Sequence, residues 1–329
     1  MEQIFKNALD SIGPVSPMPP PKKIKMSECS PAILDLVETS RLIPAQIQRT
    51  EFHQNMPCNY YEIKNPPLKV YSFGRSLNEH LWRFINKIIA LLSKLFGQRH
   101  QGQGNALQIA LGYSPLKKLL PLPLPRKKRI LEPIHVNSGV SIPSSSACVV
   151  YRQEEMCKVI LHELLHIWNF DGRRDEAMDR RIEARYKINS LHQTIRLGEA
   201  YNDAMCCIII SAIRARACAA VDAYASYHFQ IDKTRRHIFK KAGNVQEFYG
   251  SGAWTESTHA FSYYVAKAVI FQHLPLFEAW LLSQPHLGAN ADFYAFLVPL
   301  LEADSPPPDF AKYARASRSL RMLQKRECI

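Results

Sequence analysis

The sequence contains no pair of cysteines spaced as CxxC, although eight cysteines are scattered through its 329 residues. It also lacks an uninterrupted apolar run of about 20 residues, the length that a membrane-spanning helix requires. The longest apolar stretch, residues 81–96, is broken by charged and amide side chains. The first 13 residues carry acids and no continuous apolar segment, so they do not resemble a secretory signal. These absences predict a protein that has no transmembrane segment, is not secreted and works in a reducing, intracellular compartment.

Glycine is scarce as well, at 13 residues, and no internal repeat is visible, which excludes collagen-like and repeat architectures. Positive charge is in excess: 42 lysines and arginines against 29 acids give a formal net charge of +13. Such a surplus favours a polyanionic neighbour or acidic substrates. Because the basic residues are dispersed and form no zinc-finger, RRM or helix-turn-helix signature, we expect only a weak, salt-sensitive contact with polyanions.

The distribution of proline and lysine divides the chain into four parts. Residues 1–70 mix short apolar pieces with proline and lysine, which predicts an N-terminal extension. Residues 71–125 hold an amphipathic helix that ends at Gly97, followed by a proline-rich linker. We assign the main domain to residues 126–304 and a basic helix or tail to residues 305–329.

The secondary-structure pattern changes within the main domain. Residues 134–142 and 147–151 are expected to form two short strands. From residue 153 onward the apolar residues recur at helical spacing, with a late helix over about 255–271. The pattern predicts an α+β fold that is mainly helical, with a small edge-stranded sheet packed on the helix that follows it.

The feature that carries chemistry is an HExxH motif at residues 162–166. Residues four apart lie one turn apart on the same helix face, so His162 and His166 can reach one metal ion while Glu163 stands beside it. The surrounding helix is apolar almost all round, as a buried helix is. The alternative is a pair of core histidines hydrogen-bonded to backbone, but one metal ion satisfies both rings at once. We therefore predict one Zn²⁺ ion.

A catalytic zinc site needs a third protein ligand. Glu199 and Asp203 lie one turn apart at the start of an expected helix, so Glu199 can bind the metal while Asp203 accepts the free ring N–H of a ligand histidine. Alternatively, both are ordinary acids at a helix N-terminus, where the macrodipole favours them. Other candidate ligands lie nearer to the motif, on or beside a helix at 176–186 that is expected to be exposed: Asp171, Asp175, Glu176, Asp179, Glu183 and His192.

The HExxH motif at 162–166, followed by the ExxxD pair at 199–203, resembles the gluzincin metallopeptidases. In that family the two histidines and the Glu of the ExxxD helix bind zinc, which implies a zincin-like catalytic domain here. The resemblance covers about residues 130–275, with a longer interval between the two ligand helices than in thermolysin-like enzymes. Three further segments are similar to proteins of large DNA viruses that are classed as metallopeptidases: VNSGV (136–140), CVVYR (148–152) and AFSYYV (260–265).

The resemblance implies a zinc metalloendopeptidase that hydrolyses peptide bonds in a peptide or protein. Glu163 would be the general base that takes a proton from zinc-bound water and passes it to the leaving amine. The tetrahedral intermediate also needs a donor for its oxyanion. We expect Tyr263 or His259 in that role, because both lie on one face of the late helix, whereas packed aromatics and a surface histidine are the alternative.

An extended substrate is expected along the first of the two predicted strands. Asn137, Ser138 and Gly139 would pair with its backbone, and the glycine would let a second chain approach closely.

Two other classes of function fit parts of the pattern. A catalytically silent zincin-fold protein, structural or associated with a virion, would keep the metal but has no need of Glu163. A polyanion-binding protein would use the dispersed positive charge. If the viral similarity holds, the expected location is the host cytoplasm or the virion.

Overall fold

The structure is a computed structural model, and its contacts divide the chain into two compact units. The sheet unit comprises Asn7–Lys117 and Asn137–Phe170, and the helical unit comprises Met1–Lys6, Lys118–Val136 and Asp171–Lys325. The segments that the structure describes are residues 2–64, 66–97, 106–122, 130–142, 146–170, 174–192, 194–218, 223–250, 254–284, 292–303, 309–314 and 319–320.

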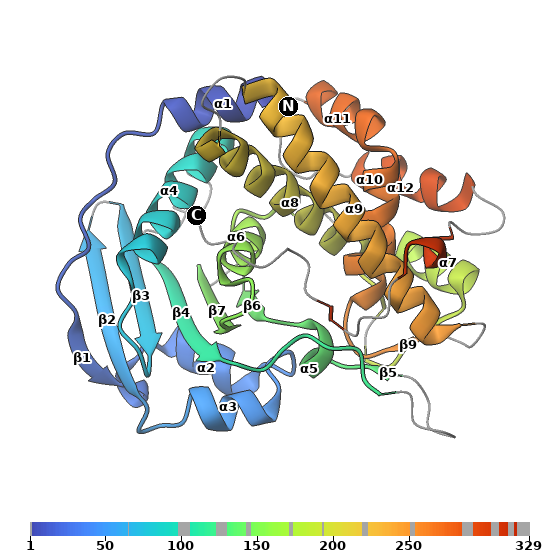
Figure 1. Cartoon of the computed structure of the whole chain (residues 1–329). Coiled ribbons are helices and arrows are strands. Elements are labelled where there is room, and N and C mark those ends of the chain that lie inside the picture. Colours follow the sequence, from blue (N-terminus) through green and yellow to red (C-terminus); the bar gives the residue numbers. More distant parts are fainter. Residues whose placement is uncertain are drawn as a thin grey trace. The chain divides into compact units, whose positions relative to one another are not determined.

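The sheet unit is built on a mixed sheet of six strands in the order β1-β2-β3-β4-β7-β6 (Figure 1). Strands β3, β4 and β7 are parallel, whereas β1, β2 and β6 join antiparallel. Strand β7 is buried along its whole length and β4 along most of it, as parallel strands covered on both faces are. The bounds are β1 Lys22–Lys25, β2 Pro57–Lys64, β3 Pro67–Phe73, β4 Leu107–Ser114, β6 Gly139–Ile142 and β7 Ala147–Arg152.

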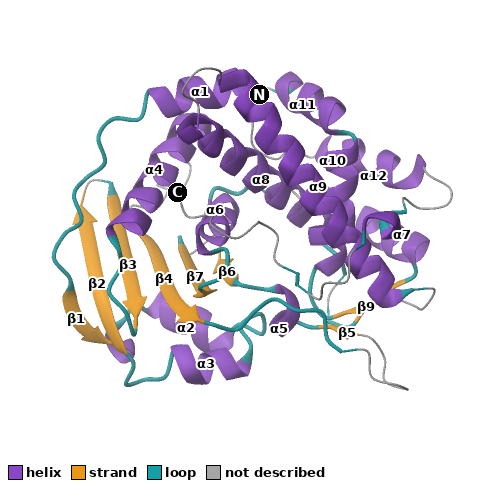
Figure 2. Ribbon diagram, viewed as in Figure 1, coloured by secondary structure: helices purple, strands orange, loops and turns teal. Residues whose placement is uncertain are grey.

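Helices cover both faces of this sheet (Figure 2). On one face, α2 contacts β6 and β7, and α3 contacts β4. On the other face, α6 packs on β6 and β7 and also contacts α4. Helix α4 is the crossover connection between β3 and β4 that allows these two strands to run parallel. The bounds are η1 Met26–Glu28, α2 Pro31–Thr39, α3 Ala45–Glu51, α4 Glu79–Phe96 and α6 Met156–Ile167.

The helical unit contains a small parallel sheet in the order β5-β9-β8 and a pair of long helices, α8 and α9, that pack on each other. Its elements are β5 Ile130–Leu131, α5 Pro133–Val136, α7 Glu176–Tyr186, β8 Ile188–Ser190, α8 Leu197–Cys218, α9 Ala223–Tyr249, β9 Trp254–Glu256, the π-helix η4 Ser262–Ala266, α10 Lys267–Gln272, α11 Leu274–Ser283, α12 Asp292–Ala303 and η5 Ala311–Tyr313. Helix α1, Glu2–Asp10, begins the chain.

Within the described segments, no single helix has the length and apolar composition to cross a membrane. The helical stretches Ser262–Gln272 and Leu274–Ser283 meet that test only as a pair, and they are bent by 88° relative to each other.

The mixture of strands with a majority of helices that the sequence predicts is confirmed, and so are three of its helices. The prediction of a small edge-stranded sheet on the HExxH helix is wrong, because the sheet that α6 packs on has six strands. Helix α4 ends at Gly97, which has the positive φ of 70° that glycine tolerates. Helix α6 is buried at all twelve positions, and α8 carries Glu199 and Asp203 in its first two turns.

Residues 1–70, expected to be an extension, contribute β1, β2 and part of β3 to the large sheet. Strand β4 likewise lies within residues 71–125, in the region expected to be a linker. Proline and lysine are frequent in the first 26 residues, which include β1, but the apolar stretches after them are long enough for buried strands.

Three predicted elements differ from the structure. The strand expected over 134–142 is α5 followed by the shorter β6, and the helix expected over 255–271 begins only after strand β9. In the predicted terminal helix, residues 311–313 form a 3₁₀ turn and Ser319 pairs with Leu119 in an isolated bridge. Residues 305–308, 315–318 and 321–329 of that tail lie outside the described residues.

Candidate metal centre

Two histidines of α6 face each other within the sheet unit. The Nε2 atoms of His162 and His166 are 3.0 Å apart, and their rings meet edge to face at 83°. Both side chains are buried, at 6% and 8% exposure. The four-residue spacing on a buried helix therefore brings two ring nitrogens to one point, which is the arrangement that a shared ligand or metal requires.

Glu163, the next residue along α6, is buried at 5% exposure in the same unit. Its Oε2 atom accepts a hydrogen bond of 2.8 Å from the Ser141 hydroxyl on β6. Burial and the nearby Glu163 carboxylate both raise the pKa of the Cys148 thiol well above its usual value. Burial likewise raises the pKa of Tyr151, with a smaller contribution from Glu163. The carboxylate therefore belongs to the packed layer between α6 and the sheet.

Glu199 and Asp203 lie one turn apart on α8, in the helical unit, and both are buried. Glu199 Oε2 accepts a hydrogen bond of 3.1 Å from the Tyr263 hydroxyl. Asp203 Oδ2 accepts one of 2.5 Å from Lys267 Nζ, and the Lys267 and Asp203 side chains are only 2% and 1% exposed. Tyr263 and Lys267, four residues apart, thus contact Glu199 and Asp203, which are also four residues apart.

His162, His166 and Glu199 could hold a metal ion, because each offers one ligand atom and the three atoms lie within 4.8 Å of one another. Two imidazoles and one carboxylate are a donor set that zinc accepts, and other divalent transition metals accept it too. All three side chains are buried, and a metal ion would offset part of the cost of burying these polar groups.

The structure gives Asp203 a cationic partner, Lys267. Its expected hydrogen bond to a ligand histidine stays a prediction. The sequence places Lys267 four residues after Tyr263, but it does not predict this ion pair. Its only signal was the matching four-residue spacing in the two segments.

The residues expected to stabilise an oxyanion lie around a π-helical turn. Tyr263 belongs to the π-helix Ser262–Ala266, and its hydroxyl contacts Glu199. His259 is buried at 2% exposure just before this helix, rather than at the surface, and its carbonyl accepts from the Tyr263 N–H. Single π-helical turns occur often at functional sites.

A buried carboxylate anchors the start of this segment. Glu256, at the end of β9, accepts hydrogen bonds from the Phe261 N–H at 2.8 Å and from Trp254 Nε1 at 2.7 Å. Complete burial raises the pKa of Glu256 to about 8. It holds the N-terminal end of the helical stretch that carries Tyr263.

Of the three residues expected to contact substrate, Asn137 and Ser138 lie just before β6 and Gly139 is its first residue. The Asn137 carbonyl accepts from Arg152 Nε at 2.8 Å, and the Ser138 carbonyl accepts from the Tyr151 N–H at 2.9 Å. At Gly139, a Cβ atom would lie 2.7 Å from Glu163 Oε1. The close neighbour that requires glycine here is thus the Glu163 side chain of the same chain.

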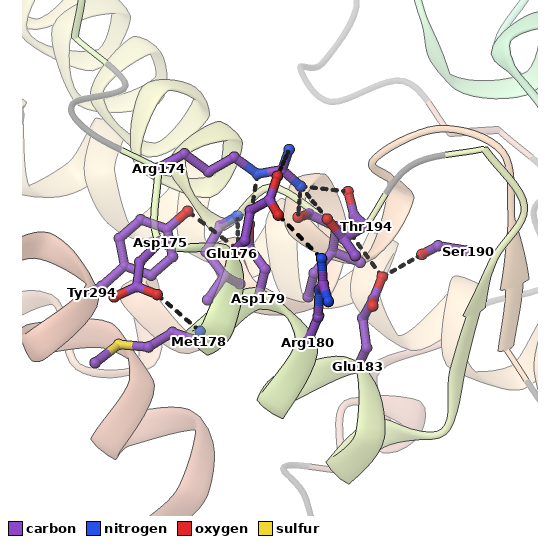
Figure 3. A network of polar contacts seen from close by, with 12 residues as sticks. Arg174, Asp175, Glu176, Met178, Asp179, Arg180, Glu183, Ser190, Thr194 and Tyr294 are labelled. Carbon is purple, nitrogen blue, oxygen red and sulfur yellow. Dashed lines mark hydrogen bonds and ion pairs between the residues drawn. The ribbon is translucent and has the colours of Figure 1, made fainter.

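The rival acids on and before α7 belong to a separate polar network (Figure 3). Arg174 Nε donates to Asp179 at 3.0 Å, and further arginine N–H groups reach Thr194 and Glu176. Asp179 is completely buried although the rest of α7 is largely exposed. His192 is exposed. Asp171 lies outside the described residues.

Sequence reasoning missed Ser141. The signal was the two-residue alternation of a strand, which puts positions 139 and 141 on the same face.

No family model, no curated protein and no solved structure matches this chain.

Proposed function

We propose that this protein is a zinc-dependent metallopeptidase in which His162, His166 and Glu199 bind one zinc ion and Glu163 acts as general base. The observation that carries the proposal is the buried group of two imidazoles and one carboxylate whose ligand atoms lie within 4.8 Å. A purely structural site would use a fourth protein ligand. Here the adjacent carboxylate is instead oriented by a serine hydroxyl.

When bound, zinc supplies Lewis acidity, which makes a coordinated water more acidic and polarises a substrate carbonyl. Glu163 accepts the proton of the attacking water and returns it to the leaving amine. Tyr263 and His259 are the proposed donors to the developing oxyanion, since they come from the segment next to Glu199 in the helical unit.

Strand β6 offers a place for the substrate, because it is an edge strand of the large sheet. Ser138 is hydrogen-bonded to Tyr151 on β7, so by antiparallel alternation the backbone groups of Gly139 and Ser141 point away from β7. We propose that an extended peptide pairs with this side of the strand, within reach of Glu163.

The cysteines support a reducing, intracellular location. Six cysteines are unbridged and buried, and they pack as small apolar side chains: Cys29, Cys58, Cys148, Cys157, Cys206 and Cys207.

Metal content of the purified full chain tests the ligand set. We expect about one zinc per chain by elemental mass spectrometry, and loss of most of it in His166→Ala. His192→Ala is the matched control, because His192 is exposed and should leave zinc unchanged. Equal zinc in the wild type and in both variants would remove the proposed centre.

The rate of peptide cleavage tests the role of Glu163 as general base. With a quenched fluorescent peptide library as substrate, Glu163→Gln should keep its zinc and lower kcat by about a hundredfold or more. The control is Glu247→Gln on α9, an exposed residue that should cleave as the wild type does. Undiminished cleavage by Glu163→Gln would sink the proposed mechanism.

A further inference from the structure

Two residues of strand β6 lie beside the two oxygens of the Glu163 carboxylate. The Ser141 hydroxyl donates to Oε2 at 2.8 Å. Gly139, two residues earlier and therefore on the same face of the strand, faces the other oxygen: a Cβ atom there would lie 2.7 Å from Oε1 and 2.8 Å from a Val159 methyl. One position supplies a hydrogen bond, and the other supplies the space in which the carboxylate lies.

The strand that carries these two residues is held firmly by its neighbour. Residues 139–142 pair antiparallel with β7, and Ser141 lies opposite Cys148. Just before β6, the completely buried Arg152 side chain binds the Asn137 carbonyl and the Leu116 carbonyl. A hydroxyl on such a strand is a fixed point, because moving it would break several buried hydrogen bonds.

Helix α6 meets this strand through the Glu163 side chain. A glutamate has three rotatable bonds between its backbone and its carboxylate, so burial by itself does not select one orientation. A donor of fixed position, the Ser141 hydroxyl, determines that Oε2 is the oxygen it holds. It also leaves the other oxygen on the side of Gly139, whose backbone groups point away from β7.

We propose that Ser141 is a positioning residue for Glu163: its hydroxyl holds Oε2 so that Oε1, above Gly139, is the oxygen that exchanges the proton. The catalytic part of this inference rests on the proposed peptidase function, whereas the Ser141–Glu163 contact stands by itself. Ser141 touches neither substrate nor metal in this scheme and acts only through Glu163.

Three substitutions of Ser141 separate orientation from packing. Ser141→Ala removes the hydroxyl, Ser141→Val replaces it with methyl groups, and Ser141→Thr keeps it on a side chain that suits a strand. On the peptide library, the first two should lower kcat by about tenfold to a hundredfold with KM and bound zinc unchanged. Ser141→Thr should restore most of kcat. Equal kcat in the valine and threonine variants would overturn the proposal, and so would loss of zinc in proportion to activity.

A double-mutant cycle on metal-free protein tests the contact without any activity measurement. Ser141→Ala should lower the urea midpoint of unfolding in the wild-type background and shift it clearly less in the Glu163→Ala background. Additive shifts would show that the two side chains do not interact. If the wild type cleaves no peptide but the cycle is non-additive, the peptidase proposal fails while the contact holds. If cleavage depends on Glu163 but the cycle is additive, the positioning role fails.

Gly139→Ala probes the space beside Oε1. The added methyl group should lower turnover at least as much as Ser141→Ala does, because it displaces the carboxylate rather than only releasing it. Val140→Ala, on the opposite face of β6, is the control for general damage to the strand and should keep most of kcat at unchanged zinc. Wild-type turnover in Gly139→Ala would contradict the proposed position of Glu163 Oε1 beside Gly139.

Discussion

Two helices of the helical unit each carry a pair of acids one turn apart, and the two pairs have different partners. On α7, Asp179 accepts from the backbone N–H of Leu197, the first residue of α8, at 3.2 Å, and Glu183 accepts from the N–H of Ile195, in the loop before α8, at 2.8 Å. On α8, Glu199 and Asp203 accept from two side chains, Tyr263 and Lys267. The same spacing therefore serves two purposes.

The α7 pair fixes the start of α8. Leu197 is the first residue of that helix, so the Asp179 carboxylate acts as its N-terminal cap from another element. Arg174 and Tyr294 also bind Asp179, and Ser190 binds Glu183 (Figure 3). Because this network is filled by protein donors, its acids are structural. Its effect reaches Glu199, which lies two residues after the capped position.

On α8, Glu199 and Asp203 accept hydrogen bonds from the side chains of Tyr263 and Lys267. Glu199 also belongs to the candidate metal group. This difference shows that a four-residue spacing of two acids does not by itself identify a metal ligand. The donors that the fold brings to each carboxylate distinguish a structural acid from a candidate ligand. Removing one donor from each network is therefore the way to test the comparison.

The largest effect is expected from Lys267→Met. This change leaves the Asp203 carboxylate buried without its cation, which costs about 3–5 kcal/mol of folding free energy. Urea unfolding of the full chain measures it. Lys233→Met, at a partly exposed site on α9, is the control and should change the free energy of unfolding by about 0.5 kcal/mol or less. A loss of similar size in both variants would show that the buried pair is not what matters.

A smaller effect is expected from Arg174→Met, about 1–3 kcal/mol, because Asp179 keeps the Leu197 N–H and the Tyr294 hydroxyl as donors. The loss should depend on pH. Burial already raises the pKa of Asp179 above 3.8, while Arg174 and Leu197 lower it in part. Removing the arginine raises this pKa further.

The sign follows from the proton count. An acid whose pKa is raised on folding contributes stability below its unfolded pKa, and that stability is lost as the pH rises through the folded pKa. The difference between the wild type and Arg174→Met should therefore be larger at pH 7 than at pH 4, because the raised pKa of Asp179 leaves more of its carboxyl protonated at the lower pH. Urea unfolding at both pH values checks this, and Arg180→Met, an exposed α7 variant, is the control. A constant difference would contradict the assignment to Asp179.

Helices α6 and α8, which carry the candidate metal ligands, could be predicted because the sequence pattern that identifies a helix is local. The spacing of His162 and His166, and that of Glu199 and Asp203, follows from the helical period. Strands β3 and β4 were missed because a buried parallel strand is a short apolar run without clear alternation. The antiparallel strand β1 was missed because its residues, KKIK, follow a proline-rich segment and read as part of an extension.

The partners of the site residues could not be predicted, because they come from distant parts of the chain. Ser141 lies 22 residues before Glu163, and Tyr263 lies 64 residues after Glu199. Periodicity shows which residues share a face of one element, but not which element packs against that face. The completely buried Asp179 on a largely exposed helix is a third example, since its burial depends on Arg174 and the loop before α8.

The smallest effect on stability is expected from Tyr263→Phe, and it discriminates between two roles for this tyrosine. Loss of one partly exposed hydroxyl should cost about 1 kcal/mol or less of folding free energy. If the hydroxyl orients Glu199 as a ligand, zinc affinity measured against a competing chelator should fall about tenfold. If it serves the oxyanion instead, zinc affinity should be unchanged and only kcat should fall.

The neighbouring Tyr264 supplies the matched control. Its buried hydroxyl donates to the Leu320 carbonyl at 3.0 Å, away from the acid pair. Tyr264→Phe should therefore cost about as much stability while leaving zinc affinity at the wild-type value. Equal zinc affinity in the two phenylalanine variants would remove Tyr263 from the ligand network, and the contrast between α7 and α8 would then depend on Lys267 alone.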